Sequence, residues 1–198
     1  MVIEQLAFPA AILVSLTGVV LLLSRDWRLS ISALAVQYSG VFALVVLSWS
    51  TELAAVKLVA GWMAGAVLGM ALAGRVGEPI ESDRLELSGL LFRLFSAVLV
   101  WLVVYSLAPV VTIRIPEITL TQAIGGLALI GMGLLHLGLT NQPLRVTLGL
   151  LTVLAGFEIL YAAVEPSSLL SGLLAAVNLG LALVGAYLLT GPGEEEKE

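Results

Sequence analysis

Long apolar runs recur along the whole chain, and they constrain its fold more than any other feature of the sequence. Runs of about 18 residues or more are long enough to cross the hydrocarbon of a bilayer as helices. Continuous runs such as AVLVWLVVYSLAPVV do not alternate between apolar and polar residues, as the strands of a membrane β-barrel do. The sequence therefore predicts an all-α integral membrane protein.

Seven membrane spans are predicted, and each is long enough to cross ~30 Å of hydrocarbon at ~1.5 Å per residue. They cover approximately Leu6–Leu23, Leu29–Trp49, Leu53–Gly74, Leu90–Val111, Ile118–Leu139, Leu144–Val164 and Leu169–Thr190. Of the 198 residues, 60% are hydrophobic and 12% are charged, and the mean hydropathy is +1.09. This composition leaves no room for a folded soluble domain.

The basic residues predict how the helices are oriented, because Lys and Arg collect in short cytoplasmic loops. With the N-terminus outside, the cytoplasmic side receives Arg25, Arg28, Arg75, Arg84, Arg93, Arg145 and Lys197. Only Lys57 and Arg114 then lie on the outer side. We therefore expect the N-terminus outside the membrane and the C-terminus inside.

Changes in composition divide the chain into segments. We expect an N-terminal three-helix membrane unit over residues 1–76, a cytoplasmic linker over 77–89, a four-helix membrane unit over 90–190 and an acidic disordered tail over 191–198. Both halves contain a span, a basic turn, a second span, a short loop with a glutamate and a small-residue span, in this order. This order suggests duplication of a three-helix unit, and chance similarity among hydrophobic sequences is the alternative.

Small residues at a period of four predict close helix contacts, since membrane helices approach one another where side chains are small. One such face contains Gly61, Gly65, Gly69 and Ala73, and a second contains Gly172, Ala176 and Gly180. These faces are expected to contact other helices of this chain or of another subunit. The alternative is that glycine is simply frequent in membrane helices.

Several kinds of chemistry are excluded by residue counts. The absence of cysteine rules out disulfides, thiolate metal sites, iron–sulfur clusters and a cysteine nucleophile, and one histidine cannot form a histidine metal cluster. The net charge is −5, so nucleic acid is not an expected partner. We find no catalytic triad and no phosphate-binding loop, and we expect no catalytic residue, cofactor or metal.

Glu158 is the only carboxylate well inside an apolar run. A charged side chain within the membrane costs at least ~2.5 kcal/mol and is a functional hypothesis by default. Glu158 is therefore a candidate proton-relay carboxylate. The alternative is a structural role, either as a protonated hydrogen-bonding residue or as one that reaches the outer interface.

Four other polar residues are candidate points on a proton route: Gln37, Lys57, Asn178 and His136. Hydrogen bonding across helices is the favoured role of Gln37 and Asn178, although Gln37 with Tyr38 also forms a polar patch that a water chain could use. His136 suits proton uptake from the cytoplasm, or simple hydrogen bonding near the interface.

Lys57 occurs near the outer end of its span. We expect its ammonium group to extend to the outer surface, as lysine side chains near helix ends do. Two alternatives are a pair with Glu52 and an inward-pointing side chain that acts as a second relay group.

The segment NQPLRVTLGLLTVLAGFEILYAAV, followed by a small-residue span, resembles the K subunit of respiratory complex I. That family has a basic cytoplasmic turn and then a glycine early in the next span, and Arg145 and Gly149 stand at the matching spacing. The whole chain resembles component E of hydrogenase-4 and formate hydrogenlyase-type complexes, and the C-terminal part is also similar to the C subunit of Mrp-type antiporters.

The resemblance implies a non-catalytic membrane subunit of a complex-I-like oxidoreductase or antiporter complex, which conducts protons or cations or braces the subunits that do. It implies antiporter-like membrane partners and a prokaryotic inner membrane or another energy-converting membrane. The K subunit has glutamates where this chain has Leu151 and Asn178. Glu158 is seven residues beyond Leu151, on nearly the same helix face, so it is either a displaced relay residue or part of a scaffold.

Two other functions fit the sequence. A stand-alone transporter with repeated halves would bind its substrate at the midplane between them. A purely structural assembly subunit would need only the small-residue faces.

Overall fold

The computed structural model describes residues 2–74, 87–165 and 167–191. They form the helices α1 (Val2–Leu23), α2 (Trp27–Val45), α3 (Thr51–Ala73), α4 (Leu87–Arg114), α5 (Leu120–Gly138), α6 (Pro143–Val164) and α7 (Ser168–Thr190). All seven are long and apolar enough to cross a membrane, and no strand occurs within the described ranges. The predicted all-helical membrane fold and the predicted number of spans are therefore confirmed for these residues.

Local sequence signals set several helix boundaries. Asp26 caps α2 by accepting a hydrogen bond from the backbone N–H of Arg28, and Thr119 forms a capping box with Gln122 at the start of α5. The second span was predicted to reach Trp49, but α2 ends at Val45 because the chain tightens there into a turn. The predicted linker lies mostly, and the predicted tail almost entirely, outside the described residues.

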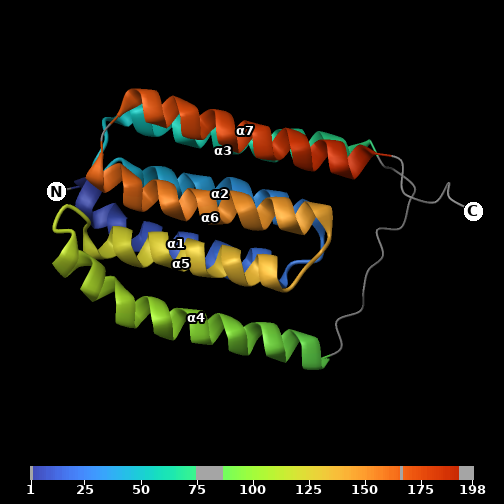
Figure 1. Cartoon of the computed structure of the whole chain (residues 1–198), viewed down its shortest axis with the longest axis horizontal. Helices are drawn as coiled ribbons and strands as arrows, with labels where there is room; N and C mark the ends of the chain where they lie inside the picture. Colours follow the sequence, from blue (N-terminus) through green and yellow to red (C-terminus); the bar gives the residue numbers. More distant parts are fainter. Residues whose placement is uncertain (1, 75–86, 166, 192–198) are drawn as a thin grey trace, which may run out of the picture.

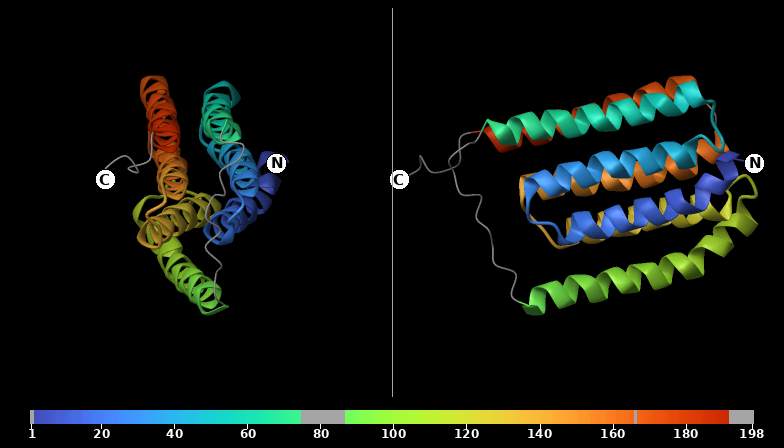
Figure 2. Two further views of the ribbon diagram at one scale, coloured as in Figure 1. Left: turned by 90° about the vertical axis from the view of Figure 1, so that its right-hand side faces the viewer. Right: turned by 180° about the vertical axis from the view of Figure 1, so that it is seen from behind.

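The helices form two layers of three, with α4 outside them. Helices α1, α2 and α3 make one layer and α5, α6 and α7 make the other (Figure 1 and Figure 2). Each helix faces its counterpart, α1 against α5, α2 against α6 and α3 against α7, and counterparts run in the same direction. Helix α4 packs mainly on α5 and leaves most of its apolar surface exposed. A site built between the layers is therefore shared by both helix triplets.

The two ends of the bundle are distinguished by their connections. At one end lie the starts of α1, α3, α5 and α7; we call it the Ser50 end, after the residue that precedes α3. At the other, the Arg145 end, α2 and α6 begin. Arg25, Arg28, Arg93 and Arg145 all lie in or near helix termini at that end, whereas Arg114 ends α4 at the Ser50 end.

Glycines allow α5 and α6 to approach backbone to backbone. A methyl group on Gly156 would lie 2.5 Å from the carbonyl oxygen of Gly126, and one on Gly133 would lie 2.9 Å from that of Gly149. Such distances leave no room for a side chain. Gly149, which the resemblance singled out, is thus a contact point between these helices.

The two predicted small-residue faces lie in different surroundings. On α3, a methyl group on Gly61 would overlap the ring of Tyr38. A methyl group on Gly65 or Gly69 would meet Ile31 at ordinary van der Waals distances. Ala73 is exposed at the helix end. On α7, a methyl group on Gly172 or Gly180 would meet nothing within 4 Å among the residues described, and Ala176 is exposed. The α3 face therefore packs within the chain, whereas the α7 face is turned away from it.

Candidate functional site

An ion pair joins the two helix triplets deep in the bundle. Lys57 of α3 donates from Nζ to Oε1 of Glu158 in α6 at 2.8 Å, and each side chain is only 1% exposed. Glu158 lies six residues before the end of α6 at Val164, about 9 Å along the helix axis. Because an unpaired charge is costly at such a position, each group holds the other in place.

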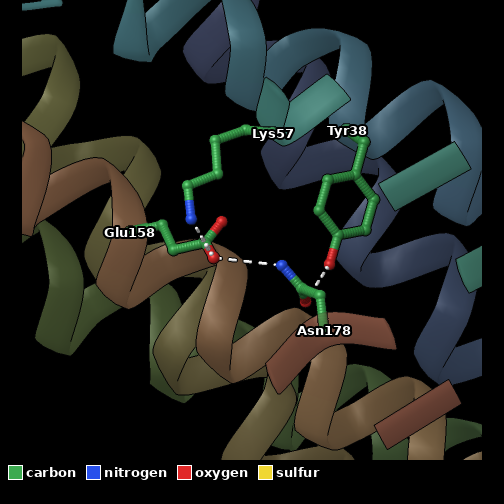
Figure 3. Close-up of polar contacts among 4 residues, drawn as sticks. All are labelled: Tyr38, Lys57, Glu158 and Asn178. Atoms are coloured by element: carbon green, nitrogen blue, oxygen red, sulfur yellow. Dashed lines mark hydrogen bonds and ion pairs between the residues drawn. The ribbon is translucent and has the colours of Figure 1, made fainter. Parts of the chain in front are cut away.

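Asn178 and Tyr38 extend this contact into a network. The side-chain amide of Asn178 in α7 donates from Nδ2 to Oε1 of Glu158 at 3.0 Å. Its Oδ1 accepts a hydrogen bond from the hydroxyl of Tyr38 in α2 at 2.8 Å. Figure 3 shows the four side chains, Tyr38, Lys57, Glu158 and Asn178, which we call the polar quartet.

The quartet takes one residue from each of α2, α3, α6 and α7. Its two links between the layers join α3 to α6, through Lys57 and Glu158, and α7 to α2, through Asn178 and Tyr38. Helices α3 and α7 face each other, as do α2 and α6. If each helix is replaced by the one that faces it, the link between α3 and α6 becomes the link between α7 and α2. The polar contacts therefore follow the same arrangement as the helices.

Gln37 forms a second polar contact between the layers. Its Nε2 donates to Oγ1 of Thr152 in α6 at 3.4 Å, and Thr152 in turn donates to the carbonyl of Leu148. Both side chains are buried. The predicted bonding of the amides of Gln37 and Asn178 across helices is therefore confirmed.

Two side-chain oxygens in this region have no protein partner among the residues described. They are Oε2 of Glu158 and Oε1 of Gln37. In Figure 3 the second carboxylate oxygen of Glu158 points into the space between Lys57 and Tyr38. The site thus keeps hydrogen-bonding capacity that its own side chains do not use.

His136 lies apart from the quartet. It is on α5 at the Arg145 end, is 3% exposed, and its Nε2 has no partner among the described residues. At the same end, Arg93 donates to the carbonyl of Leu22 and Arg145 to that of Ser24. These arginines satisfy carbonyl groups at the C-terminal end of α1, a recurring role for basic residues there.

The structure brings three of the five predicted route residues, Glu158, Lys57 and Asn178, into the quartet. Gln37 forms a separate contact with Thr152. The expectation that Lys57 reaches the outer surface is wrong, because its ammonium group is fully buried against Glu158. Lys57 therefore does not count as an outer basic residue in the argument that predicts which side of the membrane each loop faces. A lysine and a glutamate in separate apolar spans each need a partner, and this signal could have suggested the pair, although Glu52 was the only partner considered for Lys57 from the sequence.

Sequence reasoning named Tyr38 only as part of a polar patch with Gln37, and it did not identify Thr152. Both types are common in apolar helices, and only the packing of α2 against α6 and of α2 near α7 gives them partners. Leu151 is fully buried in the apolar core.

The described residues contain no group of three or more His, Cys, Asp or Glu side chains that could hold a metal ion. No protein-family model, curated protein or solved structure matches this chain. Its function must therefore be argued from the site itself.

Proposed function

We propose that this chain is a non-catalytic membrane subunit of a complex-I-like energy-converting oxidoreductase or a related antiporter complex, in which it contributes to proton or cation translocation. The observation that carries this proposal is the buried ion pair between Lys57 and Glu158 at the interface of the two helix triplets. Ionisable residues inside membrane spans commonly mark ion and proton pathways.

The geometry of the pair suits a relay. A proton that arrives at Glu158 removes its negative charge and so releases the ammonium group of Lys57 from its partner. Asn178 contacts the same carboxylate oxygen as Lys57, so part of the hydrogen bonding persists when the charges change. Loss of a proton restores the pair, and repeated cycles would couple proton movement to small displacements of α3 against α6.

The sequence resemblance and the exposed face of α7 support a multisubunit setting. Gly172, Ala176 and Gly180 present a small-residue surface that no other described helix of this chain covers. Close packing of membrane helices uses such surfaces. In the proposed function this face meets an antiporter-like subunit, and the complex lies in a prokaryotic inner membrane or another energy-converting membrane.

A stand-alone transporter is the second candidate, and one observation favours it. The helix triplets face each other in parallel, and the polar quartet lies between them. Transporters built from repeats bind their substrates at the interface of the repeats. This candidate requires the chain to act without other subunits.

Gentle extraction of the chain from its native membrane, with mass spectrometry of the proteins that copurify, separates the candidates. We expect antiporter-like subunits and a quinone- or hydrogen-linked peripheral arm. Recovery of the chain alone or as a homodimer would favour the transporter.

The relay is tested by Glu158→Gln in the reconstituted complex, with proton movement and assembly measured on the same preparation. We expect coupled proton movement to be lost while the complex still assembles. The matched control is Glu52→Gln, which changes an exposed glutamate in the first turn of α3. Unchanged proton movement in Glu158→Gln would reduce the chain to a structural subunit.

A further inference from the structure

Two buried polar groups lie on the Ser50 side of the quartet without a protein partner among the residues described: the indole Nε1 of Trp49 and the hydroxyl of Ser171. Trp49 is 4% exposed and Ser171 is 1% exposed. A buried polar group in a folded protein is nearly always paired, with water where protein atoms do not serve. These two groups therefore call for a ligand that both donates and accepts hydrogen bonds.

Ser171 differs from the other buried helical hydroxyls. Ser15, Thr17, Ser30, Thr147 and Thr152 each donate to a backbone carbonyl three or four residues earlier in the chain. This contact satisfies a hydroxyl within an apolar helix. Because Ser171 makes no such contact within the described structure, its hydroxyl remains available inside the bundle.

Both groups occur in chain segments near the Ser50 end that belong to or adjoin helices of the quartet. Ser171 precedes Asn178 by seven residues, two helical turns, and so shares its face of α7. Trp49 lies in the connection between α2 and α3, and at the same end of the bundle α6 is joined to α7. The four helices that carry the quartet are thus linked in pairs at the Ser50 end.

The opposite side of the quartet is mostly apolar beyond the contact between Gln37 and Thr152. The residues that follow it toward the Arg145 end include Leu34, Leu68, Leu148 and Leu151, each at most 1% exposed. Buried hydroxyls on that side, in Ser30, Thr147 and Thr152, are bonded within the protein. Among the described central helices, unused hydrogen-bonding capacity therefore extends toward the Arg145 end only as far as Oε1 of Gln37, whereas toward the Ser50 end it includes Ser171 and Trp49.

We propose that Trp49, Ser171 and the second carboxylate oxygen of Glu158 bind a short chain of water molecules, through which Glu158 exchanges protons with the Ser50 side. The indole N–H donates to water, the Ser171 hydroxyl donates and accepts, and Oε2 accepts. A hydronium ion arriving along this chain transfers its proton to Oε2 and leaves water behind; the reverse step returns the proton. The role in proton transfer rests on the proposed function, whereas the water sites do not.

Hydrogen exchange of the tryptophan indoles tests the water sites on the purified chain in lipid nanodiscs. Trp62 provides an internal control, because its Nε1 donates to the carbonyl of Ala35 at 3.1 Å on the exposed surface of α3. We expect the indole N–H of Trp49 to exchange with D₂O about tenfold faster than that of Trp62. The Trp62 N–H must first break its hydrogen bond to the protein, whereas the Trp49 N–H already donates to water, and one such hydrogen bond corresponds to about this ratio. Equal or slower exchange at Trp49 would overturn the proposal.

Cysteine labelling tests the side of access, and the chain has no cysteine of its own. Ser171→Cys introduces a single thiol, which reacts only as the thiolate and therefore only in contact with water. We expect a small membrane-impermeant thiol reagent to label it when added from the Ser50 side of vesicles. Leu148→Cys, on the apolar side of the quartet, is the matched control and should resist labelling from both sides. Protection of Ser171→Cys, or its labelling only from the Arg145 side, would contradict the proposal.

These outcomes separate the inference from the proposed function. Rapid exchange at Trp49 together with normal proton movement in Glu158→Gln would leave the water sites in place and remove the relay. A protected Trp49 together with loss of proton movement in Glu158→Gln would keep the relay and remove this route to it.

Discussion

Lys57 and Glu158 lie 101 residues apart in the sequence, yet their side chains form a 2.8 Å ion pair that joins α3 to α6. The pair is buried between the helix triplets, where the surroundings are mostly apolar. Each charge is therefore tolerated only because the other is present. This dependence leads to the first prediction.

Lys57→Met is expected to destabilise the chain by about 3–5 kcal/mol, because it leaves the carboxylate of Glu158 without its cation. The measurement is reversible unfolding in mixed detergent micelles, followed by circular dichroism. The double variant Lys57→Met with Glu158→Gln should recover most of the loss, since no unpaired charge then remains. A double variant as unstable as the single one would show that the pair contributes through shape and not through charge.

Tyr38→Phe removes one buried hydroxyl and keeps the ring. It is expected to cost about 1–2 kcal/mol of unfolding free energy, because Oδ1 of Asn178 loses its donor. The same unfolding assay measures this loss, and Tyr105→Phe on the exposed surface of α4 is the control. A double-mutant cycle with Asn178→Leu should show coupling between the two side chains; additive effects would contradict the hydrogen bond.

Gly61→Ala places a methyl group where the ring of Tyr38 lies. Overpacking of this kind typically costs about 1–3 kcal/mol, and here it also displaces a member of the quartet. Gly65→Ala, on the same face, meets Ile31 at 3.8 Å and Leu34 at 4.0 Å, both ordinary contact distances, and should be neutral or slightly stabilising. The comparison is made by unfolding temperature, and equal effects at the two positions would contradict the contact.

Gly156→Ala is expected to separate α5 from α6, because the added methyl group would lie 2.5 Å from a backbone oxygen and 2.8 Å from a backbone nitrogen of α5. Backbone atoms in a helix move far less easily than the end of a side chain. We expect a loss of stability larger than that of Gly61→Ala, measured in the same assay. Gly138→Ala, which meets nothing within 4 Å in the structure described, is the control.

Gly172→Leu and Gly180→Leu test whether the exposed face of α7 binds a partner. Because a methyl group at either position meets no other described atom within 4 Å, we expect the stability of the isolated chain to change little. Copurification of other membrane subunits should fall strongly, since bulky side chains prevent close helix approach. The control is Leu183→Ala on the exposed surface of the same helix, which removes a side chain of the same size instead of adding one. Normal copurification with both leucine variants would move the interface elsewhere.

Much of the fold could be predicted from the sequence alone. Long apolar runs determined the helical class and the number of spans, because a chain in hydrocarbon must satisfy its backbone within each helix. The boundaries were less certain where a turn continues the apolar run, as between Val45 and Ser50. The isolated charge of Glu158 also marked the site, since a carboxylate within an apolar span requires an explanation.

Tertiary structure decided which side chains meet. The sequence places Lys57 near a helix end and gives no sign that its ammonium group turns inward, because helix period fixes the face of a residue but not the helix opposite. Only the facing of the two triplets brings α3 to α6 and α2 to α7, and so assembles the quartet. The same packing buries the glycine face of α3 and leaves that of α7 exposed, although their sequence patterns are alike.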